Sequence, residues 1–90
     1  MIVKVFANLR DICNSDKVEV NLDGDKVIDV LNTLIDMFPD LKDEIFTEEK
    51  QLKQFVHVFV NGRNIVHDQG LETKVKPDDQ FALFPPVAGG

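Results

Sequence analysis

Residues 78–90 read DDQFALFPPVAGG and place a strand, a stop signal and a tail in immediate succession. Side chains alternate along a strand, so Phe81 and Leu83 are expected on one face of QFALF and Phe84 on the other. The two prolines that follow have no backbone N–H to donate, so the strand ladder is expected to end before them. We therefore predict a folded domain over residues 1–84 and an extended, flexible tail over residues 85–90.

The predicted tail suits insertion into a narrow channel of a partner. Six extended residues reach roughly 20 Å, and a final glycine pair has no Cβ to obstruct a narrow catalytic slot. The chain lacks both GxxxxGK[ST] and GxGxxG, so ATP-dependent activation of the tail carboxylate would occur in a partner. The residues expected to thread into the channel are Pro85, Pro86, Val87, Ala88 and Gly89, with Gly90 as the reacting residue.

Upstream of the tail, the hydrophobic pattern predicts further strands and one main helix. FVHVFV (55–60) alternates and ends at Asn61-Gly62, a strong hairpin-turn dipeptide, with a short return over 64–67. Apolar residues recur at helical spacing from Val27 to Phe38, where a proline stops the run. Asp25 is the expected N-cap of this helix.

The remaining segments complete the predicted order. Residues 2–8 and 17–22 alternate as two strands of a first hairpin, joined by a polar loop. PDLKDEIF (39–46) is expected to add one or two turns whose apolar residues tuck against the core, and residues 47–54 read as a solvated loop. This order predicts an α+β fold with a mixed four- to five-stranded sheet and one main helix on one face.

The composition fits one soluble domain. Ninety residues with 43% hydrophobic and 29% charged side chains suffice for a single core. A net charge of −6 favours a basic partner and argues against nucleic acid. No signal segment or membrane-length apolar run occurs, and Cys13 is the single cysteine, so we expect a cytoplasmic protein that does not bind membranes.

Several phenylalanines fall, by alternation, opposite the valine-rich faces of their strands. A sheet covered by one helix leaves its other face open, so Phe6, Phe59 and Phe84 are expected to form an exposed patch that binds partners. Phe55 and His57 are further candidates for this patch. Alternatively, some of these rings belong to the core, as a register slip of one residue would place them there.

The other reactive residues give no site. His57 and His67 have no familiar metal-ligand spacing with Cys13 or with carboxylates, so no metal site is predicted. Cys13 has no identifiable base and is expected to be a loop or partly buried residue.

The element order, VFVNG at residues 58–62 and the closing DDQFALFPPVAGG resemble the ubiquitin-like β-grasp sulfur carriers. The chain is most similar to the MoaD family, the small subunit of molybdopterin synthase, and to archaeal ubiquitin-like small modifiers. ThiS-type thiamine carriers share the terminal Gly-Gly but less of the Phe-Pro-Pro stretch. Phe6 and Phe84 match family positions that contact the activating enzyme and the synthase subunit.

The resemblance implies that a ubiquitin-activating-type adenylyltransferase uses ATP to adenylate Gly90, and that a sulfur donor protein then yields a thiocarboxylate. The molybdopterin synthase large subunit would receive this sulfur. The chain itself would bind no cofactor and would be a carrier, or the non-catalytic small subunit, rather than an enzyme. Because the sequence ends at Gly90, no protease step is expected before activation.

The segment DEIFTEEKQLKQF (43–55) is longer than the compact bacterial pattern and looks like that of archaeal and stand-alone carriers. This leaves the acceptor open. The alternatives are sulfur delivery for tRNA thiolation or another pathway, conjugation to lysines of target proteins, and a non-covalent adaptor with an inert tail.

Overall fold

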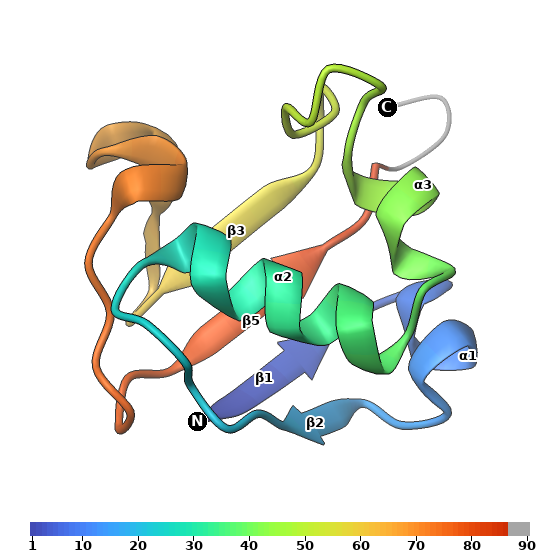
Figure 1. Ribbon diagram of the computed structural model, residues 1–90, viewed down its shortest axis with the longest axis horizontal. Helices are drawn as coiled ribbons and strands as arrows, with labels where there is room; N and C mark the ends of the chain where they lie inside the picture. The colour runs from blue at the N-terminus through green and yellow to red at the C-terminus, as the bar shows by residue number, and fades with distance from the viewer. Residues whose placement is uncertain (87–90) are drawn as a thin grey trace.

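The computed structural model describes residues 1–86 and contains one mixed sheet covered by a helix (Figure 1). The sheet has five strands in the order β2-β1-β5-β3-β4. The strands are β1 (Ile2–Val5), β2 (Lys17–Glu19), β3 (His57–Val60), β4 (Arg63–Asn64) and β5 (Phe81–Phe84). The helices are α1 (Leu9–Cys13), α2 (Val27–Met37) and α3 (Leu41–Ile45), with 3₁₀ turns η1 (Ile65–His67) and η2 (Gly70–Glu72).

The predicted fold class is confirmed, and β5 lies at the centre of the sheet. It pairs in parallel with β1 and antiparallel with β3, whereas β1–β2 and β3–β4 are antiparallel pairs. Asn61 and Gly62 both have positive φ, as the type I′ turn of a two-residue hairpin requires. The expected NG hairpin is therefore present.

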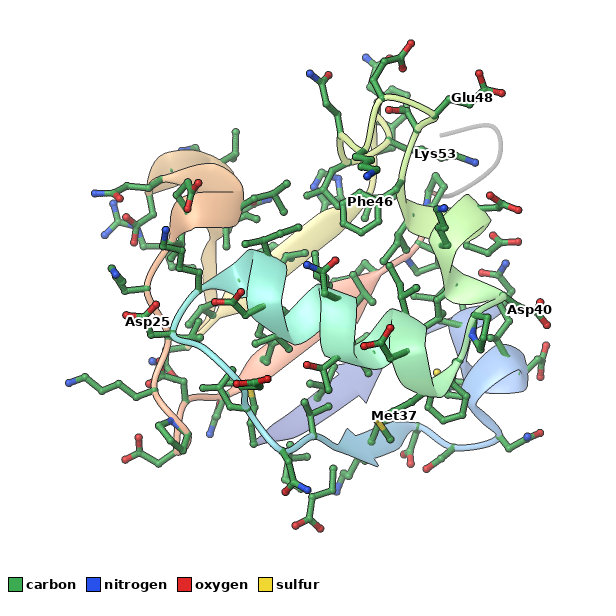
Figure 2. The ribbon with its side chains drawn as sticks, in the orientation of Figure 1. Asp25, Met37, Asp40, Phe46, Glu48 and Lys53 are labelled. Atoms are coloured by element: carbon green, nitrogen blue, oxygen red, sulfur yellow. The ribbon has the colours of Figure 1, made fainter. Side chains whose placement is uncertain are left out.

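The core lies between the sheet and α2. Val3, Val5, Val58 and Leu83 are fully buried and pack with the apolar side of α2. Burial of Leu41, Ile45 and Phe46 confirms that the segment after Pro39 tucks against the core. Figure 2 shows Phe46 inside, with Asp40 and Glu48 at the periphery.

Three local predictions were wrong. The short return predicted over 64–67 is instead β4 at Arg63–Asn64, and Ile65–His67 form the 3₁₀ turn η1. Residues 8–16 are not only loop, because Leu9–Cys13 form α1, which buries Leu9 and Cys13 and ends at Asn14 in the left-handed conformation. Asp25 does not cap α2, whose N-cap is Lys26. Instead the Asp29 carboxylate reaches back and accepts hydrogen bonds from the backbone N–H groups of Asp25 and Lys26, both at 3.1 Å.

Within residues 1–86 no helix has the length and apolar character needed to cross a membrane.

Candidate partner-docking face

The structure brings Phe6, Phe59 and Phe84 together on the face of the sheet that α2 leaves open. The rings of Phe6 and Phe84 stack with centroids 4.2 Å apart and planes 9° apart. Phe59 meets Phe84 edge to face at 5.5 Å. We call these three residues the aromatic cluster. All three are half-buried, so the predicted patch forms and none of its rings is a core residue.

Strand register explains why the cluster forms. Phe59 is the cross-strand partner of Ala82, and His57 is the partner of Phe84, so these side chains share one face of β3 and β5. Phe6 follows β1 directly, and Val5 is the partner of Leu83, which places Phe6 beside Phe84. β3 and β5 therefore contribute one ring each, and the residue directly after β1 contributes the third.

Arg10 is a member of this site that the sequence did not reveal. Its guanidinium carbon lies 5.5 Å from the centroid of the Phe6 ring, within the range of a cation–π interaction. Its Nε donates a hydrogen bond of 3.2 Å to the Val5 carbonyl. Arg10 is in α1, which we had expected to be loop, and a loop gave no reason to place Arg10 on Phe6.

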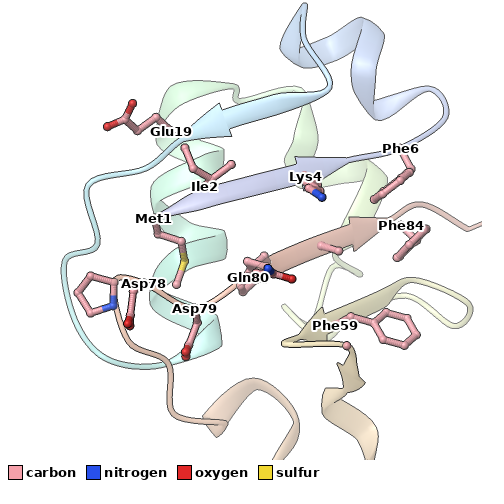
Figure 3. A pocket seen from close by; sticks show the side chains of 14 residues that line it. Met1, Ile2, Lys4, Phe6, Glu19, Phe59, Asp78, Asp79, Gln80 and Phe84 are labelled. Carbon is pink, nitrogen blue, oxygen red and sulfur yellow. The ribbon is translucent and has the colours of Figure 1, made fainter.

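The aromatic cluster forms one end of a shallow trough of about 680 Å³ that runs along the open face. Figure 3 shows the three rings at one end, Lys4 in the middle, and Met1, Asp78 and Asp79 at the other end. Charge thus changes along the trough, from Lys4 in the middle to the carboxylates of Asp78 and Asp79 at the far end. Asn61, which donates to Asp79, and the Lys76 N–H lower the pKa of the Asp79 carboxyl.

The first two residues of the predicted tail, Pro85 and Pro86, do not project from the domain as an extended arm. Pro85 is buried and Pro86 is half-buried. The ladder ends at Phe84 as predicted, but Pro85 continues the alternation that buries Phe81 and Leu83, so its ring faces inward. The remaining tail residues, Val87, Ala88, Gly89 and Gly90, lie outside the described residues, and their predicted roles stay predictions.

Comparisons with known proteins agree with this geometry. The ThiS family matches residues 3–90. The chain belongs to the ThiS family.

Relatives of this ThiS-family chain include archaeal modifiers. It is 34% identical over 88 residues to small archaeal modifier protein 1 of Haloferax volcanii, covering 97% of each chain. It is 42% identical to the solved small archaeal modifier protein 1 of Methanosarcina acetivorans, with a TM-score of 0.83 and coverage of 99% and 94%. It is also 28% identical to a protein of Pyrococcus furiosus described as a candidate molybdopterin converting factor, subunit 1, with a TM-score of 0.74 and coverage of 96% and 95%. The chain is thus a ubiquitin-like β-grasp protein of the sulfur carrier and small modifier type.

The other candidate residues of this ThiS-family chain lie as follows. His57 is exposed on the same face as Phe84, with Nδ1 3.3 Å from Asn64 Nδ2. Phe55 does not join the cluster, because β3 begins two residues later and Phe55 adopts a positive φ of 73° that turns it out of the strand. Burial raises the pKa of the Cys13 thiol, which makes Cys13 a poor nucleophile.

Proposed function

We propose that this protein is a sulfur carrier whose Gly90 carboxylate is adenylated by a ubiquitin-activating-type adenylyltransferase. A carboxylate oxygen attacks the α-phosphorus of ATP and pyrophosphate leaves. Hydrosulfide supplied by a sulfur donor protein then attacks the acyl carbon, and AMP leaves, giving a thiocarboxylate. In this scheme the chain has no ATP site and no catalytic group of its own. The chain and its partners would act in the cytoplasm.

The match of the ThiS family through residue 90, over a sequence ending FPPVAGG, carries this proposal. The aromatic cluster supports it from the described residues. Phe84 and the buried Pro85 are adjacent in the sequence, so a partner that docks on the open face also meets the start of the tail. One binding event therefore holds the tail near the partner's catalytic site, which makes the reaction effectively intramolecular.

The test is ATP-dependent activation of the purified protein by an adenylyltransferase from the same cells. We expect intact mass spectrometry to detect the acyl-adenylate, and a sulfur-for-oxygen mass increase once the sulfur donor is added. Deleting Gly90 should abolish both products while leaving the circular dichroism spectrum unchanged. Normal activation of the deleted chain would refute the proposal.

For the sulfur acceptor we favour molybdopterin formation, with this chain as the small synthase subunit, which the likeness to the Pyrococcus furiosus protein supports. The thiocarboxylated protein, mixed with the large synthase subunit and the pterin precursor, should return to the carboxylate mass as molybdopterin forms. Retention of the sulfur in that mixture would exclude this acceptor.

Conjugation to lysines is a second candidate, supported by 34% identity to a small archaeal modifier protein. The expected sign is a ladder of heavier tagged species on a denaturing gel, resistant to reducing agent and lost when Gly90 is deleted. A single band under these conditions would count against conjugation.

A further inference from the structure

The charge around the aromatic cluster is opposite to the charge of the whole chain. The protein carries 16 acidic residues and 10 lysines and arginines, and its net charge of −6 suggested a basic partner. On the open face, however, Lys4 and Lys17 are direct cross-strand partners in the β1–β2 ladder. Lys4 lies on the same face as Phe6, two residues further along the chain, and Arg10 lies over the Phe6 ring. Arg10 therefore lies on the aromatic cluster, and the Lys4–Lys17 pair follows it along the same face.

The placement of these cations is unfavourable for the isolated domain. Directly opposed residues on an antiparallel pair have Cβ atoms roughly 4.5–5.5 Å apart, and like charges there are destabilising. Within residues 1–86 the ion pairs are Lys26–Glu72 and Lys74–Asp25, so none neutralises Lys4, Lys17 or Arg10. Arg10 stabilises the fold through Phe6 and the Val5 carbonyl, but folding gains nothing from opposing Lys4 to Lys17, whereas a bound anionic partner would gain from that pair.

The carboxylates on the same face do not cancel this charge. Glu19 is opposite Ile2 in the β1–β2 register, one step away from the lysine pair. Asp78 and Asp79 are both at the far end of the trough, where the Asp79 carboxylate accepts hydrogen bonds from Asn61 and from the Lys76 N–H. Lys4 and Arg10 thus lie nearer the rings than Asp78 and Asp79 do.

The aromatic cluster also limits what kind of anion can bind. Nucleic acid bases bind proteins by stacking on open ring faces. Phe84 covers one face of Phe6 at 4.2 Å, and Arg10 also lies over the Phe6 ring. Because the Phe6 ring is thus covered and cannot stack on a base, carboxylates of a protein are the better match for these cations.

We propose that the open face docks an acidic protein surface, in which carboxylates meet Lys4, Lys17 and Arg10 and an apolar side chain packs on the aromatic cluster. The partner would therefore be acidic where it docks, contrary to the expectation from net charge. This inference rests on the proposed function, since it concerns the surface that presents the tail to the adenylyltransferase.

The experiment measures kcat and KM of ATP-dependent adenylation by the adenylyltransferase from the same cells, across a salt series. The test variant combines Lys4→Glu with Lys17→Glu, and the matched control combines Lys42→Glu with Lys50→Glu. All four lysines are exposed, and the control pair lines a different depression beside α3. We expect the test variant to lower kcat/KM about tenfold at low salt, with kcat unchanged and a smaller loss at high salt because salt screens exposed charges. The control should behave as the wild type.

Glu19→Lys gives a measurement of opposite sign. On an acidic partner it should raise kcat/KM at low salt, because it adds a cation to the open face. Equal behaviour of the test and control variants, or a lower kcat/KM for Glu19→Lys, would overturn the inference. No adenylation of the wild-type chain would instead refute the proposed function, so the two failures are distinguishable.

Discussion

On the helix side of the sheet, Val3, Val5 and Leu83 are completely buried, whereas on the open side Phe6, Phe59 and Phe84 remain half-exposed. Both sets come from the same sheet by the same alternation. The first set packs against α2, whereas the rings of the second set pack on one another and Arg10 lies over Phe6. The difference shows that larger apolar side chains need not be the more buried ones. The rings on the open side are better explained by a partner than by the core.

The strongest test of this comparison is Leu83→Ala on the helix side. It removes a fully buried side chain from the central strand, and the surrounding core cannot fill the space completely. We expect a loss of about 2–5 kcal/mol in the free energy of unfolding. Urea denaturation followed by circular dichroism measures it. A loss no larger than that of an exposed alanine substitution would contradict the assignment of this face as the core.

Phe84→Ala, one residue further along β5, should affect stability less and activation more. It removes the stacked contact with Phe6 and the edge contact with Phe59, which together contribute about 1–3 kcal/mol. Because truncating a central interface aromatic often costs more than 1 kcal/mol of binding, kcat/KM for adenylation should fall about tenfold or more. Leu83→Ala, assayed where it is still folded, is the control. Equal effects on activation would remove the distinction between the faces.

The smallest expected effect concerns the polar end of the trough. The Asp79 carboxylate accepts hydrogen bonds from the Asn61 side chain and from the Lys76 N–H. Because Asp79→Ala removes both, it should lower the free energy of unfolding by roughly 1 kcal/mol at neutral pH. The folded state lowers the pKa of Asp79 from its ordinary value of 3.8. Its contribution is therefore present above about pH 4 and is lost as the pH falls through the lowered pKa. Urea denaturation from pH 7 to acid should show the two proteins converging. A difference that grows on acidification would contradict this.

Regular alternation and helical spacing in the sequence were enough to predict the layers of the fold. Val18, Val58, Phe81 and Leu83 are buried as their strand patterns indicated, and the NG turn forms its hairpin. The aromatic cluster was also predictable, because Phe6, Phe59 and Phe84 all fall opposite the valine-rich faces of their strands. These features depend only on local periodicity, which a sequence displays directly.

The features that were missed depend on contacts between distant or irregular segments. Arg10 is on a five-residue helix too short for periodicity to reveal, and its place over Phe6 follows from the tertiary fold. Phe55 leaves the strand through a single positive φ that its residue type does not suggest. The opposed pair Lys4 and Lys17 requires the register of two strands, which the intervening α1 segment sets.

The central position of β5 has a consequence for biosynthesis. Of the five strands, β5 is synthesised last, yet β5 is the strand that joins the β1–β2 pair to the β3–β4 pair. Before β5 emerges, the two pairs have no strand between them, and such long-range pairing is slow. Phe84 arrives with β5, so a nascent chain has no complete aromatic cluster to offer an activating enzyme. The docking face can thus be complete only after translation has reached the tail.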